Sequence, residues 1–148
     1  WDINLDRQQW GSLLHECLAQ IHYPKDKEEV LDKLERNGLI SVEMKSKLRN
    51  RIEELLKDEQ LMPFFLEDWE VKTEQIILLD SGESYVPDRL LFKNNKVKII
   101  DYKTGSTSEI EKHKKQVDRY YKVLKNMGFK EIYKYIIYTE ENDKIVQW

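Results

Sequence analysis

Residues 85–105 read YVPDRLLFKNNKVKIIDYKTG, and this stretch has the pattern of a β-hairpin. Residues 85–92 alternate and favour β structure, residues 93–96 supply turn residues, and residues 97–100 form an apolar, β-branched run. Asp88 interrupts the first predicted strand and Asp101 ends the second. Side chains alternate along a strand, so Lys103 points to the same side as Asp101. Pairing across the turn predicts that Asp88 and Asp101 meet at one end of the hairpin.

Two carboxylates that lie close together repel each other unless a proton or a cation neutralises them. Hard oxygen ligands favour Mg²⁺, with Mn²⁺ as a substitute, and the main-chain carbonyl of Tyr102 can complete the protein ligands. Lys103 would then orient a water molecule or stabilise charge on a phosphorus transition state. The alternative is a salt-bridged hairpin that binds no metal.

Pro87-Asp88, followed after the hairpin by Asp101-Tyr102-Lys103, resembles the signature of the PD-(D/E)XK nuclease superfamily. The wider pattern is similar to the RecB-like nuclease domains of UvrD/AddA-type helicases. The matching motifs are, in chain order, Gly11 with His15, Glu74, Pro87 with Asp88, Asp101 with Lys103, and Gln116 with Tyr120. They span residues 11–120 in the order that the family shows.

The resemblance implies an α/β fold, an α+β mixed sheet with a restriction-endonuclease-like core and an N-terminal helical cap. It also implies a metal-dependent DNA nuclease, an exonuclease that acts with a helicase motor in DNA repair or recombination. The helicase domains of the same parent chain, and a second helicase-nuclease subunit, are the protein partners that it suggests. The competing hypothesis is a catalytically inactive, nuclease-like domain that binds DNA or scaffolds its helicase. An unrelated metal-binding structural domain would leave the basic helix described below unexplained.

The same resemblance assigns roles to residues outside the hairpin. His15 would reach the metal beside Asp88, Asp101 and Tyr102, and Glu74 would act as a base or hold a metal-bound water. Gln116 and Tyr120 lie one helical turn apart and would hold a phosphate or brace Lys103. Without the resemblance, His15 and Tyr120 read as core residues and Gln116 as a surface residue. Gly11 costs ~1 kcal/mol in a helix interior, so we expect a close neighbour there.

Length and composition set further limits. The 148 residues predict one nuclease-like domain, with a helical part at 1–68 and a sheet core at 69–148. The chain opens on Trp1 rather than Met, so we expect a piece from the C-terminal end of a longer helicase-nuclease of the bacterial cytoplasm. The single Cys17 excludes a cysteine-ligated iron–sulfur cluster, which needs about four thiolates. No apolar run reaches the roughly 18 to 20 residues of a membrane span, so a membrane is not an expected partner.

The charges are unevenly distributed along the chain. The formal net charge is −3, but residues 93–134 contain twelve Lys or Arg and five Asp or Glu, a balance of +7. A basic face beside an acidic metal site would attract DNA phosphates, and Lys112, Lys114 and Lys115 are the predicted contacts. The alternative is a lysine-rich, solvated helix face.

Periodicity and turn residues predict the remaining elements. The expected helices cover residues 5–21, 27–37, 42–58 and 108–127, with one short helical turn at 58–66. The expected strands cover residues 70–79, 85–92, 97–100, 130–139 and 144–148, the first three forming a meander. The strand–helix–strand connection after Lys103 should be parallel and right-handed.

Overall fold

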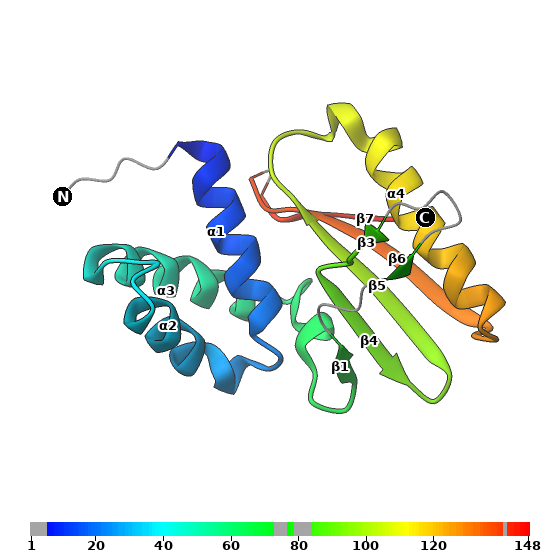
Figure 1. Cartoon of the computed structure of the whole chain (residues 1–148), viewed down its shortest axis with the longest axis horizontal. Coiled ribbons are helices and arrows are strands. Elements are labelled where there is room, and N and C mark those ends of the chain that lie inside the picture. Colours follow the sequence, from blue (N-terminus) through cyan, green and yellow to red (C-terminus); the bar gives the residue numbers. More distant parts are fainter. Residues whose placement is uncertain (1–5, 73–76, 79–83, 141) are drawn as a thin grey trace.

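A five-stranded mixed sheet lies between a group of three helices and a single fourth helix (Figure 1). The computed structural model describes residues 6–72, 77–78, 84–140 and 142–148. The helices are α1 (Arg7–Gln20), α2 (Lys27–Arg36), α3 (Val42–Lys57) and α4 (Ile110–Asn126), and the short 3₁₀ turns are η1 (Pro24–Asp26), η2 (Met62–Phe65) and η3 (Thr107–Glu109). The strands are β1 (Glu70–Lys72), β2 (Ile77–Leu78), β3 (Ser84–Tyr85), β4 (Arg89–Lys93), β5 (Lys96–Lys103), β6 (Glu131–Tyr138) and β7 (Lys144–Gln147). The mixed sheet, the helical cap and the order of the elements confirm the predicted fold class.

The strand order of the main sheet is β1-β4-β5-β6-β7. Among the described strands only β5 and β6 are parallel, and α4 connects them, as the sequence predicts. The other neighbouring pairs are antiparallel. The carboxyl ends of β5 and β6 therefore meet at one edge of the sheet, where Lys103 lies opposite Tyr138.

The hairpin between β4 and β5 turns at two asparagines. Asn94 and Asn95 have φ angles of 48° and 67°, the left-handed conformation that a two-residue type I′ turn needs and that asparagine tolerates. The predicted strand at 85–92 is wrong in one respect. Tyr85 pairs with Ile77 in a separate two-stranded sheet, and β4 begins only at Arg89. Pro87 lies between them and has no N–H to donate to a strand ladder, which accounts for the interruption.

The predicted end of the second hairpin strand is also wrong. Asp101 does not end β5, which continues to Lys103, because Asp101, Tyr102 and Lys103 remain paired with residues 136–138 of β6. Asp101 can therefore lie within the buried strand β5, because the main chain around it stays paired with β6. The expected strand at 70–79 appears as β1 and β2, with residues 73–76 outside the described part of the chain.

Two apolar clusters form the core, one on each face of the sheet. One joins Leu91, Ile100 and Tyr102 to the helices α1, α2 and α3. The other joins Leu90, Ile99 and neighbouring residues to the buried side of α4. Since side chains alternate along a strand, Asp88, Asp101 and Lys103 belong to the face that α4 covers.

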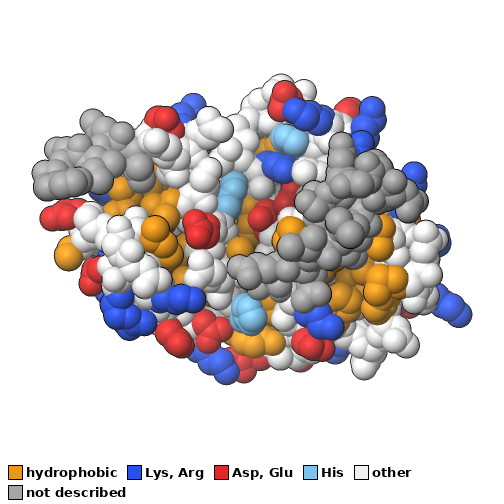
Figure 2. Space-filling model, in the orientation of Figure 1, with side chains coloured by type: hydrophobic (Ala, Val, Ile, Leu, Met, Phe, Trp, Pro, Cys, Tyr) orange, Lys and Arg blue, Asp and Glu red, His pale blue; other side chains and the backbone are white. Residues whose placement is uncertain are grey.

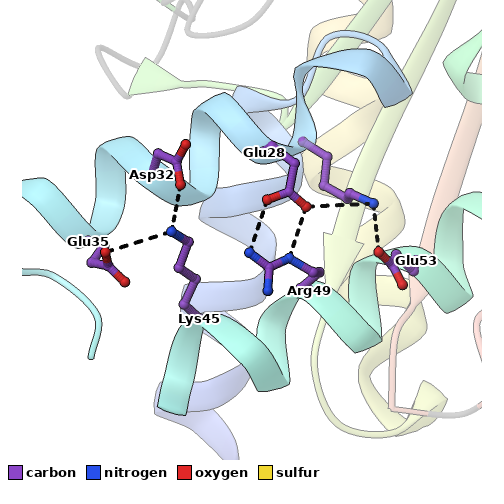
Figure 3. Close-up of polar contacts among 7 residues, drawn as sticks. Glu28, Asp32, Glu35, Lys45, Arg49 and Glu53 are labelled. Atoms are coloured by element: carbon purple, nitrogen blue, oxygen red, sulfur yellow. Dashed lines mark hydrogen bonds and ion pairs between the residues drawn. The ribbon is translucent and has the colours of Figure 1, made fainter. Parts of the chain in front are cut away.

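Capping residues fix the ends of the helices. Asp6 and Gln9 form a capping box at the start of α1, and Ser41 accepts the Met44 N–H at the start of α3. Ion pairs also link α2 to α3 along their exposed sides, and Figure 3 shows Arg49 against Glu28 and Lys45 against Asp32. Such exposed pairs each contribute little, about 0–1 kcal/mol, but they fix how the two helices lie against each other.

Arg89 fastens the helical part to the sheet. Its buried guanidinium donates to the main-chain oxygens of Ile21, His22 and Phe64, at the end of α1 and in η2. The guanidinium also lies 4.3 Å from the centre of the Phe65 ring. These carbonyl dipoles stabilise the buried cation, so the residue next to Asp88 holds α1 and η2 against β4.

None of the helices in the described part of the chain is long and apolar enough to cross a membrane.

Candidate active site

The structure brings Asp88, Asp101 and Lys103 together at the end of the β4–β5 hairpin. The register pairs Arg89 with Ile100, so the next residues along the two strands are Asp88 and Asp101. Lys103 Nζ lies 2.9 Å from Asp101 Oδ2. The Asp101 side chain is 5% exposed and that of Lys103 is 22% exposed, so Lys103 is the more exposed member of the pair.

The Asp88 side chain accepts a main-chain hydrogen bond from β5 that a residue of β4 would accept if that strand continued. Its Oδ2 accepts the N–H of Tyr102 at 2.7 Å. If the register continued, Pro87 would lie opposite Tyr102, and proline has no N–H to offer the Tyr102 carbonyl. In a strand the N–H and C=O of one residue point to the same side, so this carbonyl is directed toward Asp88. It is therefore a suitable third oxygen ligand, and the ligand role of Tyr102 stays a prediction.

The electrostatics of the two carboxyl groups suit a divalent cation. Burial, together with the neighbouring Asp101 carboxyl, raises the pKa of Asp88 well above its ordinary value, although the Tyr102 N–H and Lys103 act in the opposite direction. Asp101 Oδ2 is buried and, among the described atoms, has no hydrogen bond of acceptable geometry, despite the nearby ammonium. The Lys103 ammonium supplies one positive charge to two adjacent buried carboxyl groups, and a divalent cation would supply the positive charge that the pair still needs. The donor set is all oxygen, which suits Mg²⁺.

Gln116 holds Lys103 in place from α4. Its Oε1 accepts a hydrogen bond from Lys103 Nζ at 3.0 Å, which matches the bracing role expected for it. Tyr120, one turn later, is only 1% exposed and fills the cluster between α4 and the sheet. The expectation that Tyr120 contacts nucleic acid does not fit this position, because its ring has no surface left for a phosphate.

His15 approaches the site from α1. A Cβ atom added at Gly11 would lie 1.9 Å from Thr104 Cγ2, so the predicted close neighbour of this glycine is Thr104, directly after β5. One turn later, the His15 ring lies 5.7 Å from the Tyr102 ring, and its Nε2 is 2.8 Å from Thr139 Oγ1. Burial lowers the pKa of His15 to about 4, an effect that Asp101 opposes and Lys103 reinforces. The imidazole is therefore neutral at neutral pH, as a metal ligand must be.

The predicted ligand set is not assembled as a finished metal centre. In the described parts of the chain, no three side chains of Asp, Glu, His or Cys come together as a metal site. His15 contacts Thr139, and Asp101 is paired with Lys103. The groups that could bind a metal are therefore the oxygens of the two carboxylates and of the Tyr102 carbonyl. Glu74, the predicted base or water ligand, lies outside the described residues.

The surface around this group is mixed in charge. A space-filling view shows histidine, acidic and cationic side chains meeting in the hollow between the helices and the sheet (Figure 2). On α4, Lys112 and Lys115 are exposed, and Lys114 is 3.8 Å from Glu111. A further hollow of ≈ 400 Å³ on the same helix is lined by Lys115, Asp118, Arg119, Tyr121, Lys122 and Lys134. Of the predicted lysines, Lys115 thus belongs to a wider, mainly basic surface.

Two polar residues at the site escaped the sequence analysis. Thr139 follows β6 and contacts both His15 and the main chain of Lys103. His113 lies one turn before Gln116, with its Nδ1 2.9 Å from the Tyr138 hydroxyl. The parallel pairing of β5 and β6 was the available signal, since the carboxyl ends of parallel strands meet at one edge and residues there are candidates for a site.

Comparison with known proteins agrees with this geometry. A search of curated proteins found no match to the chain. The family model of the PD-(D/E)XK nuclease superfamily matches residues 1–144, a range that includes every residue of the site. The fold, the Asp88, Asp101 and Lys103 group and this match lead to one conclusion: the chain belongs to the PD-(D/E)XK nuclease superfamily.

Proposed function

We propose that the chain is a Mg²⁺-dependent deoxyribonuclease that hydrolyses phosphodiester bonds. The observation that carries this proposal is the arrangement of Asp88, Asp101 and Lys103 on one face of the sheet, where two adjacent buried carboxyl groups share one ammonium. A domain with a purely structural role gains nothing from two adjacent buried carboxyl groups, because their repulsion destabilises it.

Asp88, Asp101 and the Tyr102 carbonyl would hold the metal, with His15 beside them. When bound, Mg²⁺ supplies positive charge that attracts the phosphate and makes a nearby water more acidic. Lys103 then stabilises the charge that develops on the phosphoryl oxygens, and Gln116 keeps its ammonium in position. Glu74 is proposed to accept a proton or hold a water. The lysines of α4 bind the DNA backbone away from the reacting phosphate.

The finer part of the proposal comes from the likeness to RecB-like domains. We infer an exonuclease that degrades the DNA strand delivered by a helicase motor of the same polypeptide, in DNA repair or recombination in the bacterial cytoplasm. A second helicase-nuclease subunit would be a further partner. Metal dependence rests on the site itself, whereas the helicase and the exonuclease mode rest on the pattern of motifs.

One observation favours a second candidate function, an inactive DNA-binding or scaffolding domain. In the described part of the chain, the acidic and histidine side chains do not come together as a complete metal site. The Lys103 ammonium is also paired with the Asp101 carboxylate. In that case the basic surface of α4 would bind DNA without cleavage.

Single-turnover cleavage of linear DNA separates the two candidates. The wild type should cleave with Mg²⁺ or Mn²⁺ and be inactive with Ca²⁺ or EDTA, because Ca²⁺ accepts looser geometry. Asp101→Asn should bind DNA and fail to cleave it. If the wild type binds DNA but cleaves neither blunt, tailed nor circular DNA with either metal, the domain is a scaffold.

A further inference from the structure

The exposed side of α4 carries positive charge over most of its length. Every exposed residue between positions 112 and 125 is Lys or Arg, namely Lys112, Lys115, Arg119, Lys122 and Lys125. Their spacing of three or four residues places them on one side of the helix. At a rise of 1.5 Å per residue, this row is about 20 Å long. The cations between α2 and α3 are different, because they pair with acids, as Arg49 does with Glu28.

The one acid within this stretch of α4 is already compensated. Between positions 112 and 125 only Asp118 is acidic. Its Oδ1 accepts hydrogen bonds from Lys134 Nζ at 2.8 Å and from Trp148 Nε1 at 2.9 Å. Asp118 therefore adds little negative potential to the row, and Lys134 brings a cation of β6 to the side of α4.

A hollow of ≈ 400 Å³ lies beside the row, between α4 and β6. Its wall contains four cations, Lys115, Arg119, Lys122 and Lys134, against the single carboxylate of Asp118. Tyr121 also lines the hollow, and the Lys134 ammonium lies 4.9 Å from the centre of its ring. Cationic grooves with aromatic walls are typical binding sites for single-stranded nucleic acid, whose phosphates meet the charges and whose bases stack.

The row leads away from the candidate active site. Helix α4 passes the site near its start, where Gln116 accepts a hydrogen bond from Lys103. Just after the other end of α4, Phe129 packs against Phe92 next to the hairpin turn, with 5.6 Å between the ring centres. Figure 1 shows α4 lying along the sheet between these two ends. A strand bound along the whole row would extend from the reacting phosphate to the far end of the sheet.

We propose that Arg119, Lys122, Lys125 and Lys134 form a distal basic surface that binds single-stranded DNA several nucleotides away from the phosphate that is cut. The choice of DNA as the polyanion rests on the proposed function, which assigns contacts only to lysines nearer the start of α4. At the spacing of about 3.4 Å between phosphates along one strand of B-form DNA, the row covers about six nucleotides. A single strand can bend its phosphates into the row and the hollow. A duplex cannot follow them as closely, because it is stiff over about 150 base pairs.

Fluorescence anisotropy of a labelled oligothymidylate of about 15 nucleotides, in EDTA so that no cleavage occurs, tests the distal surface. The distal variant carries Arg119→Glu, Lys122→Glu and Lys125→Glu, and it should bind the strand about tenfold or more weakly. The slope of log K against log salt should also fall by about 2, because each phosphate contact of a single strand contributes about 0.7. Binding of a blunt duplex of the same length should depend less on these three residues.

The matched control reverses three exposed cations of α2 and α3, with Lys33→Glu, Arg36→Glu and Lys47→Glu. This control variant has the same net charge as the distal variant but an intact row. It should keep the wild-type salt slope, because only the long-range field of the protein changes.

Equal losses of affinity and slope in the distal and control variants would overturn the proposal, and so would a wild type that does not bind the strand. An equal effect of the distal variant on duplex binding would overturn the assignment to single strands. A wild type that binds through the distal surface but never cleaves would instead refute the proposed function and leave this surface standing. If the distal variant does not fold, Arg119→Gln, Lys122→Gln and Lys125→Gln together should produce the same fall in slope.

Discussion

Gly11 on α1 and Thr104 after β5 are in such close contact that no side chain fits at position 11. A Cβ atom there would lie 1.9 Å from Thr104 Cγ2 and 3.1 Å from Thr104 Cβ. Helix α1 can therefore approach the end of β5 only because residue 11 is glycine. His15, one turn later, reaches the site through this approach.

We expect Gly11→Ala to destabilise the protein, even though alanine favours a helix by ~1 kcal/mol. Overpacking typically costs about 1–3 kcal/mol, and the clash with Thr104 should exceed the helical gain. In a Thr104→Ser background, which lacks Cγ2, the same change should cost less or become neutral. Urea unfolding of the four proteins measures this coupling. Equal effects of Gly11→Ala in both backgrounds would show that Thr104 is not the obstacle.

Mg²⁺ or Mn²⁺ should raise the melting temperature of the wild type, because a ligand that binds only the folded state stabilises it by about 2.7 kcal/mol at 100 times its dissociation constant. Asp101→Asn should abolish this rise, since it removes one carboxylate oxygen and the negative charge that would bind the ion. Asp68→Asn is the matched control, because Asp68 pairs with Lys93 on the surface, away from the site. An equal metal response in all three proteins would show that the ion binds elsewhere.

The pH dependence of stability should report on Asp88. Burial and Asp101 raise its pKa in the folded protein above the ordinary value of 3.8, so the folded state keeps a proton that the unfolded chain releases. The stability of the metal-free wild type should therefore fall as the pH rises from about 4 toward the raised pKa. Asp88→Asn cannot lose a proton, so this fall should be smaller in the variant.

Unfolding by urea at pH 5 and pH 8 without metal measures this difference. The wild type should lose more stability than Asp88→Asn between the two values. His15 acts in the opposite direction below pH 6.5, because burial lowers the pKa of His15 and folding there disfavours its charged form. His15 is present in both proteins, so its effect cancels when the wild type is compared with Asp88→Asn. Parallel curves for the two proteins would contradict the assigned shift.

The hairpin motif was predictable because its signals are local. Two asparagines mark the turn, and alternation along the strands places Asp101 and Lys103 on one face. The glycine at position 11 predicted a close neighbour, but the neighbour itself, Thr104, lies far away in the sequence and could not be identified. The features of the hairpin depend on neighbours within a few residues or on one backbone rule.

What the sequence concealed depends on contacts between distant segments. Asp101 looked like the end of a strand because its pairing with Ile136 of β6 cannot be seen locally. Tyr85 looked like part of β4 because an alternating pattern does not show that Pro87 breaks the ladder. Thr139 carried no motif, and its contacts with His15 and Lys103 form only where α1, β5 and β6 come together.

The last prediction separates an enzyme from a DNA-binding module. Lys103→Ala should leave metal binding intact or slightly tighter, because the ammonium 2.9 Å from Asp101 Oδ2 competes with the ion. The same change should slow single-turnover DNA cleavage by on the order of 10² or more, the usual loss when a positioned electrostatic group is removed. DNA affinity should fall only slightly, since one phosphate contact contributes modestly.

Charge reversal at Lys112, Lys114 and Lys115 should have the opposite profile. These side chains lie on α4, and their loss should weaken DNA binding and reduce its salt dependence while sparing the cleavage step at saturating protein. Gln116→Leu should resemble Lys103→Ala in kind but be milder, because it releases the ammonium without removing it. The assay is single-turnover cleavage of linear DNA with Mg²⁺, paired with a binding titration at several salt concentrations. If the wild type and Lys103→Ala prove equally inert while both bind DNA, the chain binds DNA without cutting it and Lys103 has no catalytic role.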